Sequence, residues 1–247
     1  MEAFERGAAY YEVFANSVKR LEREGPFLLE RFRRAPGRRV LDLACGTGPH
    51  ALFLAGHGGM VTAVDAGAGM IAFARRVRPH PNIEYRVGDM RRVEGGPWDF
   101  ALCLGNSLSL IDSRDGLHQV FQSLSTTLTP GALFIVQVLN YATEAARSPR
   151  HRIEHGHPDD AEIVAVKNLV PHGDCTLLSL NYFVFQGEGI EAVSETAVLR
   201  HWTREDLADV AAVHGFVVAE CFGGFDGRTW EMTHAPDLVI VFRKNIS

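Results

Sequence analysis

The sequence contains no run of apolar residues close to the roughly 20 that a membrane-spanning helix requires. Its first residues, MEAFERGAAYYEVF, also lack the basic segment followed by an apolar core that marks a secretory signal peptide. We therefore expect a cytoplasmic protein that does not contact a membrane.

Clustered positive charge is missing as well. The formal net charge is −5, and the basic residues form no block of the kind that binds the phosphates of nucleic acids. These features argue against a nucleic-acid partner and favour a small-molecule substrate.

The cysteines indicate neither disulfides nor zinc, because the four of them form no C-x-x-C pair. They are Cys45, Cys103, Cys175 and Cys221, and most of them lie in apolar runs, where reduced and buried thiols are common. The segment HRIEHGH carries His151, His155 and His157, but Gly156 and Pro158 deny it the rigid helix face that a metal-binding histidine pair uses. We predict a solvated loop there and no bound metal.

Short β-rich runs alternate with helical patterns from residue 39 onward, beginning with RVLDLA, HALFLAGH, MVTAVD and GMIAFARRV. This alternation predicts crossover units and a parallel sheet covered by helices on both faces. Apolar residues at intervals of three and four predict two further helices ahead of the sheet, at 8–22 and 26–34.

The pattern changes between residues 142 and 201, where strand-like alternation in segments such as TLLSLNYFVFQ predicts an antiparallel insertion. Thr203 and Asp206 then predict a capping box at the start of a helix that ends at Gly215, and FVVAECF and DLVIVFR supply the last two strands. A chain of 247 residues with 46% apolar content fits one domain. Its expected parts are N-terminal helices (1–37), the first part of the sheet (38–141), an inserted cap (142–201), and a C-terminal helix and strands (202–247).

The segment VLDLACGTGPH, residues 40–50, interrupts a strand pattern with a glycine turn. GTGPHA satisfies the G-x-G-x-x-G/A pattern by which dehydrogenases bind a pyrophosphate. Asp42 lies close to this turn, and two like charges ~6 Å apart at an effective dielectric of about 20 repel by nearly 3 kcal/mol. Unless Asp42 only caps a helix, it favours a ligand with positive charge and no phosphate. S-adenosylmethionine, which carries an ammonium and a sulfonium, fits this description.

Two further acids follow the next two strand patterns. Asp65 ends MVTAVD, where it can accept hydrogen bonds from two ribose hydroxyls. Asp89 follows IEYRV, where it can accept from the amino group of adenine while Met90 gives the ring an apolar edge; capping a turn is the alternative role of Asp89. Since open α/β sheets bind ligands at the carboxyl ends of their strands, the three acids predict one crevice.

These segments, together with WDFALCLGNSL and LTPGALFIVQVLNY, resemble the class I S-adenosylmethionine-dependent methyltransferases. CLGNSL, LNY and LNYFVF are similar to segments of the glycine and sarcosine N-methyltransferases and related small-molecule N-methyltransferases. The resemblance implies a Rossmann-like α/β sandwich with a mostly parallel sheet of seven strands whose last strand is antiparallel, and it makes 38–141 the cofactor-binding half. With Asp42 and Met70 of the same segments added, the expected cofactor contacts are Tyr11, Ala44, Gly46, Gly48, Asp65, Ala66, Asp89, Met90, Leu104 and Asn106.

Methyl transfer from a sulfonium depends on alignment, which supplies effective molarities of about 10⁵ M or more when the acceptor lies near ~3 Å from the methyl group. An amine that arrives unprotonated then needs no dedicated base. The candidate catalytic residues are Asn140 and Tyr141 after the fifth strand, Tyr182 in the cap, and Arg200 before the last helix. The tyrosine rings can pack around a cationic centre, and Arg200 can bind a carboxylate. Their alternatives are ordinary packing for the tyrosines and an unpaired surface position for Arg200.

Three functions remain open on the sequence alone. The leading one is methyl transfer from S-adenosylmethionine to a small molecule, with an amine slightly preferred and S-adenosylhomocysteine as product. An NAD(P)-dependent oxidoreductase has the same glycine pattern, and a module that binds S-adenosylmethionine without catalysis has the same cofactor site.

Tyr11 is expected on a first helix that folds over the cofactor as a lid. The oligomeric state is left open.

Overall fold

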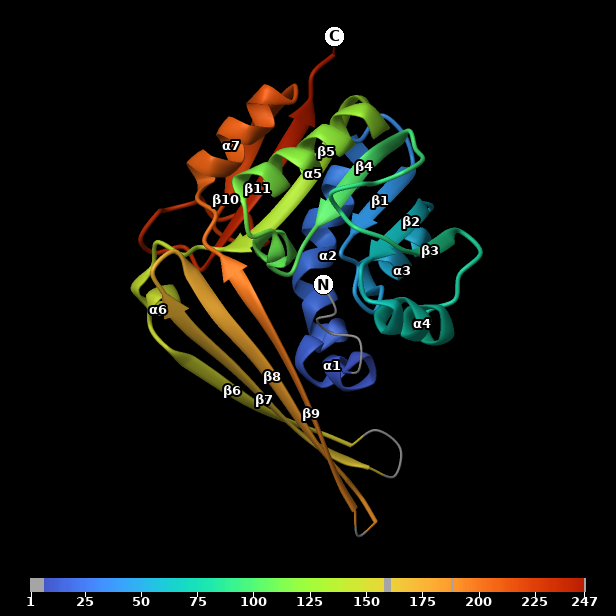
Figure 1. Ribbon diagram of the computed structural model, residues 1–247. Coiled ribbons are helices and arrows are strands. Elements are labelled where there is room, and N and C mark those ends of the chain that lie inside the picture. Colours follow the sequence, from blue (N-terminus) through green and yellow to red (C-terminus); the bar gives the residue numbers. More distant parts are fainter. Residues whose placement is uncertain (1–6, 158–160, 188, 247) are drawn as a thin grey trace.

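The computed structural model describes residues 7–157, 161–187 and 189–246 and contains two sheets (Figure 1). The larger has seven strands in the order β10-β11-β5-β4-β1-β2-β3, and the smaller has four in the order β6-β7-β8-β9. The smaller sheet projects away from one end of the larger one, with helix α1 (Ala8–Ala15) packed against it.

Five strands of the large sheet are parallel to one another, with register pairs such as Asp42 with Ala63. Strand β11 (Asp237–Lys244) is antiparallel to both of its neighbours, β5 and β10 (Phe216–Phe222). The predicted seven-stranded sheet with an antiparallel last strand is therefore confirmed. The parallel strands are β1 (Arg39–Leu43), β2 (Met60–Asp65), β3 (Ile83–Val87), β4 (Trp98–Cys103) and β5 (Leu128–Leu139).

Helices cover both faces of the large sheet, as a buried parallel sheet requires. Phe32, Leu54 and Ile71 belong to the core on one face, and Phe121 and Leu207 belong to the core on the other. Thr203 and Asp206 form the predicted capping box. The first face carries α2 (Ser17–Arg34), α3 (Pro49–Gly56) and α4 (Ala68–Val77), and the second carries α5 (Arg114–Thr127) and α7 (Arg204–Val213).

The two N-terminal helices divide at a different residue from the one predicted. The chain breaks at Asn16, whose φ of 38° is left-handed, and α2 then continues through Pro26 without interruption. Asparagine tolerates this conformation, and the Asn16 side chain accepts a hydrogen bond from the amide of Lys19 at 3.4 Å. The prediction of a helix at 8–22 followed by another at 26–34 is therefore wrong in its boundary.

The segment between β5 and α7 begins with a short helix, α6 (Glu144–Arg147), and then forms the predicted antiparallel insertion. HRIEHGH is not a loop, because His151 and His155 lie on the first strand of this sheet, opposite Asn168 and Val164. The polar composition of this edge strand concealed its alternation. We call the four-stranded sheet the cap sheet, and its strands are β6 (Arg150–Gly156), β7 (Glu162–His172), β8 (Cys175–Gln186) and β9 (Gly189–Arg200).

The inner face of the cap sheet shares a core with α1. Tyr182 is fully buried in this core, with its ring centroid 5.7 Å from that of Tyr10 and 5.9 Å from that of Phe14. Its hydroxyl has no hydrogen-bond partner among the described residues. Tyr182 thus attaches α1 to the cap sheet by apolar packing.

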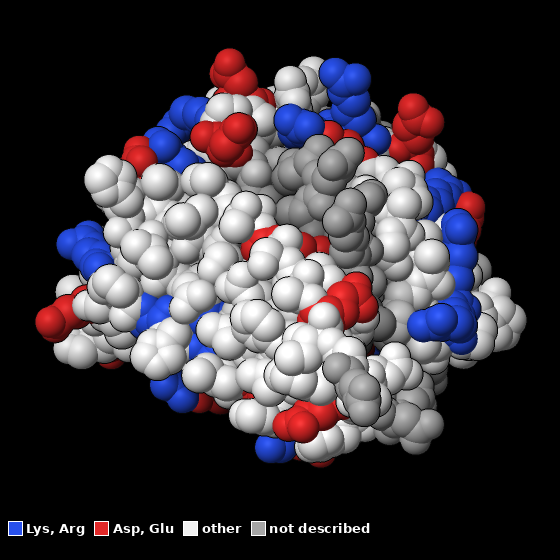
Figure 2. All heavy atoms as spheres, turned by 60° about the horizontal axis from the view of Figure 1, so that its bottom comes forward, with Lys and Arg blue, Asp and Glu red and all other residues white. Residues whose placement is uncertain are grey.

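The outer face of the cap sheet is apolar and exposed. Figure 2, which brings the bottom of Figure 1 forward, shows uncharged side chains over most of the middle of this side and charged ones mainly around its edge. The exposed apolar residues of β8 and β9 include Leu177, Phe183, Phe185, Ile190 and Val198.

Three further features concern the residues that the structure describes. None of their helices is both long enough and apolar enough to cross a membrane. All four cysteines are free, and Cys45 and Cys103 are buried. No group of three His, Cys, Asp or Glu side chains among them is arranged to hold a metal ion.

Gly48 has no room for a side chain, whereas Gly58 has. A Cβ at Gly48 would lie 2.7 Å from the Tyr85 hydroxyl oxygen, whereas Gly58, with a similar positive φ, faces open space. We expect Gly58→Ala to lower the free energy of unfolding by about 1–2 kcal/mol through backbone strain, and Gly48→Ala to lower it by about 1–3 kcal/mol more. Urea denaturation measures both, and equal losses would contradict the steric effect.

Tyr182→Phe removes a buried hydroxyl that has no partner among the described residues, so we expect the melting temperature to stay the same or rise. Tyr85→Phe is the control, because the Tyr85 hydroxyl donates to the Arg78 carbonyl at 3.0 Å and its loss should cost about 1 kcal/mol. Thermal unfolding compares the two. A clear loss of stability in Tyr182→Phe would mean that its hydroxyl does have a partner.

Candidate active site

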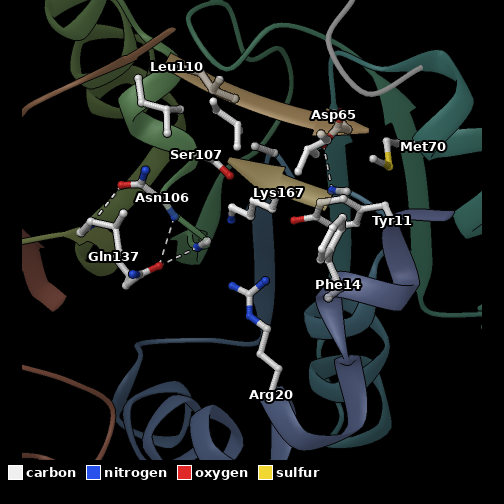
Figure 3. A pocket seen from close by; sticks show the side chains of 18 of the residues that line it. Tyr11, Phe14, Arg20, Asp65, Met70, Asn106, Ser107, Leu110, Gln137 and Lys167 are labelled. Carbon is white, nitrogen blue, oxygen red and sulfur yellow. Dashed lines mark hydrogen bonds between the residues drawn. The ribbon is translucent and has the colours of Figure 1, made fainter. Parts of the chain in front are cut away.

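A cavity of about 670 Å³ lies at the carboxyl ends of the parallel strands, between them and the inner face of the cap sheet. Residues of α1 and of the first turns of α2 form its third wall, and Figure 3 shows side chains from all of these elements pointing into it. This volume is within the range of small-molecule sites, and the position is the usual ligand crevice of an open α/β sheet.

Most of the predicted cofactor residues meet in this cavity. Asp42 and Leu104 instead line a smaller pocket beside it, which shares Tyr11, Ala44 and Gly46 with the cavity. Gly48 lines neither and packs against Tyr85. The predicted residues on the cavity wall are Tyr11, Ala44, Gly46, Asp65, Ala66, Met70, Asp89, Met90 and Asn106.

Asp65 joins two loops at the edge of the sheet. One of its carboxylate oxygens accepts from the amide of Gly46 and the other from the amide of Gly67, both at 2.8 Å. Burial raises the pKa of Asp65, and these two hydrogen bonds act in the opposite direction. Gly46 has a φ of 55°, and a Cβ there would enter open space within the cavity. The loop after β1 is therefore fixed by Asp65 and leaves room for a ligand beside its backbone.

Asp42 is buried in β1, and its Oδ2 has no hydrogen-bond partner among the described residues. Burial raises the pKa of this carboxyl to about 7, although the charge of Arg20 acts to lower it. A buried carboxyl oxygen without a donor is costly unless a ligand supplies one. Asp42 therefore fits a ligand group that carries N–H donors and a positive charge.

Arg20 of α2 is a site residue that the sequence did not identify. Its Nε donates to Glu24 at 3.0 Å, and a Cβ on Gly105 would lie 3.0 Å from its Nη2. Burial acts to raise the pKa of Glu24, but His50 and Arg20 outweigh it and hold the pKa at about 2. Arg20 lines both the cavity and the pocket that contains Asp42. The crevice therefore carries a positive charge in addition to the three predicted acids.

Asp89 is half-exposed at the rim of the cavity and pairs with Arg91, whose Nη2 lies 2.5 Å from Oδ2. The hydrogen bonds from Arg91 lower the pKa of Asp89, so the carboxylate is ionised. An ionised carboxylate has about four acceptor sites and can accept a further donor from a ligand.

A network of amide side chains shapes the turn after β4. The Gln137 Oε1 accepts from the amides of Gly105 at 2.8 Å and Asn106 at 3.1 Å. The Asn106 Oδ1 accepts from the Leu139 amide at 2.9 Å, and its Nδ2 donates to the Tyr141 hydroxyl at 2.7 Å. The hydrogen bonds of Asn106 thus fix this wall of the cavity. They also compensate for its left-handed backbone conformation, which has a φ of 65°. A lone glutamine in the apolar run ALFIVQVL was the signal that sequence reasoning overlooked.

The four predicted catalytic residues lie away from the cavity wall. Asn140 is buried, and its Nδ2 donates to the carbonyls of Met232 and Ala235 at 2.8 Å. Arg200 pairs with Asp174 at 2.7 Å. Tyr141 stacks on His201 with ring centroids 4.1 Å apart, and Tyr182 is buried beneath α1. None of the four side chains lines the cavity as predicted, because each is held by other protein groups; Tyr141 reaches the wall only through its hydrogen bond with Asn106.

Comparison with known proteins identifies the fold and the activity. Residues 40–131 match the family model described as a methyltransferase domain. The chain is 29% identical over 133 residues to the glycine N-methyltransferase of Oryctolagus cuniculus, a match that covers 47% of this chain and only 45% of that protein. It is 23% identical over 209 residues to the dTDP-4-amino-2,3,4,6-tetradeoxy-D-glucose N,N-dimethyltransferase of Saccharopolyspora spinosa, covering 81% of this chain and 80% of that protein.

The crystal structure of an S-adenosylmethionine-dependent methyltransferase from Clostridium acetobutylicum ATCC 824 has the same fold. It aligns over 98% of this chain and 99% of that chain, with a TM-score of 0.80 and 18% identity. These matches favour the methyltransferase interpretation of the glycine loop over the oxidoreductase one. The chain therefore carries a methyltransferase domain over residues 40–131 and has the fold of an S-adenosylmethionine-dependent methyltransferase.

Proposed function

We propose that this enzyme transfers a methyl group from S-adenosylmethionine to an amino nitrogen of a small molecule. The observation that carries the proposal is the Asp65 loop, which opens onto a cavity whose cap-facing wall is mainly apolar. A neutral amine presents its own lone pair, so alignment with the methyl group is sufficient and none of the carboxylates in the lining has to act as a base. Support also comes from the glycine and amino-sugar relatives, whose names describe N-methyltransferases.

The residues of this chain fit the two ends of the cofactor separately. Asp65 lies where its carboxylate can accept the ribose hydroxyls, and Asp89 and Met90 line the wall expected to hold the adenine. At the other end, Asp42 has a free carboxyl oxygen for an ammonium, and Arg20 has a guanidinium for a carboxylate. When bound, the cofactor supplies a methyl group on a sulfonium, which reacts with a nucleophile by direct displacement.

The acceptor side of the cavity is mainly apolar. Its leucines exclude water from the reacting nitrogen, so the amine has little competition from solvent. The turn after β4 gives this region a fixed polar edge, because the Ser107 hydroxyl donates to the Leu104 carbonyl and the Asn106 Oδ1 accepts from the Ser109 hydroxyl. Tyr141 and Arg200 act as positioning residues, since Tyr141 bonds to Asn106 of this turn and Arg200 pairs with Asp174 of the cap. Asn140 holds the C-terminal turn that contains Met232 and Ala235. The leucines are Leu110, Leu139, Leu169, Leu178, Leu180 and Leu199.

Calorimetry with S-adenosylhomocysteine and NADH tests the cofactor. We expect micromolar affinity for S-adenosylhomocysteine and no binding of NADH. Asp65→Ala loses a charged acceptor and the tether to Gly46, so its affinity should fall by roughly 100-fold. Asp226→Ala, at an exposed residue outside the cavity, is the control and should bind as the wild type does. Binding of NADH with similar affinity would contradict the assignment.

Mass spectrometry then tests the acceptor, using matched panels of amines, phenols and carboxylic acids. We expect a mass increase of one methyl group on amines. Methylation confined to phenols or acids would reject nitrogen as the acceptor atom, and no methylation in any panel together with tight binding of S-adenosylhomocysteine would favour a non-catalytic module.

Asp42 makes cofactor affinity depend on pH. Since the pKa of this carboxyl is about 7 in the folded protein, it is mostly protonated at pH 6 and mostly ionised at pH 8. Only the ionised form attracts an ammonium, so the affinity for S-adenosylhomocysteine should increase by about tenfold from pH 6 to pH 8. Asp42→Asn should bind weakly at both pH values. Calorimetry gives the affinities, and an equal pH dependence in the variant would assign the effect to another group.

The same carboxyl affects stability without a ligand. The pKa of Asp42 in the folded protein is about 7, above the usual value of a carboxyl group. The protonated carboxyl therefore stabilises the fold at low pH, and this stabilisation is lost as the pH rises through 7. Asp42→Asn should therefore unfold at a higher temperature than the wild type at pH 8, and the difference should shrink as the pH falls toward 4.

A further inference from the structure

Lys167 is a basic side chain on the apolar inner face of the cap sheet. It lies on β7 between Ala165 and Leu169 on the same face, and it lines the cavity. Figure 3 shows its amino group pointing into the cavity from the cap, and the guanidinium of Arg20 pointing in from α2. Packing against its β7 neighbours Ala165 and Leu169 does not explain a lysine at this position.

The carboxylates around the cavity have other donors. Glu24 accepts from Arg20 and His50, Glu154 accepts from Arg152, and Asp237 accepts from Gln137 at 2.8 Å. The Lys167 side chain makes no hydrogen bond and no ion pair with any residue that the structure describes, although its backbone is paired in the sheet. Its positive charge therefore has no counter-charge in the protein as described.

The neighbours of Lys167 are positive. Arg152 lies directly opposite it on β6, and like charges in this position destabilise a sheet. On the same face of β6, Arg150 has a buried Nε without a hydrogen-bond partner among the described residues. Burial lowers the pKa of Lys167, and the charges of Arg152, Arg150 and Arg20 lower it further.

We propose that Lys167 forms a subsite for an anionic group of the methyl acceptor, a carboxylate or a phosphate. This inference rests on the proposed function, because it describes the acceptor that the cavity receives. The cofactor has its own basic residue in Arg20, which adjoins the loop after β1 and the pocket of Asp42. Lys167 comes from the opposite wall, among the leucines of the cap. The acceptor is thus an amine that also carries a negative charge, with Lys167 as a specificity-determining residue.

Anion binding can be measured without an acceptor. The sequence has only three lysines, so ¹³C-labelled lysine gives three side-chain signals, and Lys167→Met identifies one of them. In the complex with S-adenosylhomocysteine, we expect acetate or inorganic phosphate to shift the Lys167 signal and to raise the pH at which it titrates. Lys244, which donates to two backbone carbonyls, is the internal reference. A response to acetate alone or to phosphate alone distinguishes the two sources of the anion, and no response to either overturns the proposal.

Matched acceptors test the same subsite in catalysis. The pairs are glycine with glycinamide and glucosamine 6-phosphate with glucosamine, which differ in their negative charge. Lys167→Met should raise KM for the anionic member of an accepted pair by roughly 10- to 100-fold, and should change kcat and the affinity for S-adenosylhomocysteine less than twofold. Lys167→Arg should retain most of the discrimination. Arg243→Met, at an exposed basic residue outside the cavity, is the control for loss of charge alone.

The outcomes separate this inference from the proposed function. Equal effects of Lys167→Met on both members of a pair, or a loss of S-adenosylhomocysteine affinity in that variant, would overturn the subsite while amine methylation still stood. A Lys167 signal that responds to anions, in a protein that methylates only phenols or acids, would reject nitrogen as the acceptor atom but keep the anion subsite.

Discussion

The hydrogen bonds of Asp65 are the constraint on which the site depends. A single carboxylate at the end of β2 accepts hydrogen bonds from the amides of Gly46 and Gly67. It therefore fixes the turns after β1 and β2 relative to each other. The sheet places the two strand ends side by side, but the conformation of the turns between them and their helices is set by this residue. The shape of the ligand crevice is kept because these two turns cannot relax independently.

The site concentrates features that reduce stability. Asp42 is a buried carboxyl with a free oxygen, Lys167 is a cation without a counter-charge among the described residues, and Ala44 and Asn106 have left-handed backbone conformations. Each is unfavourable by itself. Together they line the cavity and the smaller pocket beside it, so the ligands can supply the missing donors and charges.

The sequence was sufficient for the sheet, for the antiparallel cap and for most of the residues that meet in the cavity, because strand alternation and the acids at strand ends depend on local patterns. It was insufficient for side chains whose partners are distant in sequence. Asn140 points to the turn containing Met232 rather than to the acceptor. Arg20 and Lys167 face one another only after α2 and the cap sheet are assembled. The N-terminal break was missed because the left-handed preference of Asn16 outweighs the helix-starting signal of Pro26.

The stacked rings of Tyr141 and His201 bring together the two ends of the inserted cap. A segment that leaves and re-enters a scaffold at one point can change in length or sequence at little entropic cost to the rest of the chain. The large sheet and the strand ends at the cavity can therefore keep their geometry while the cap differs in length or sequence as a single piece.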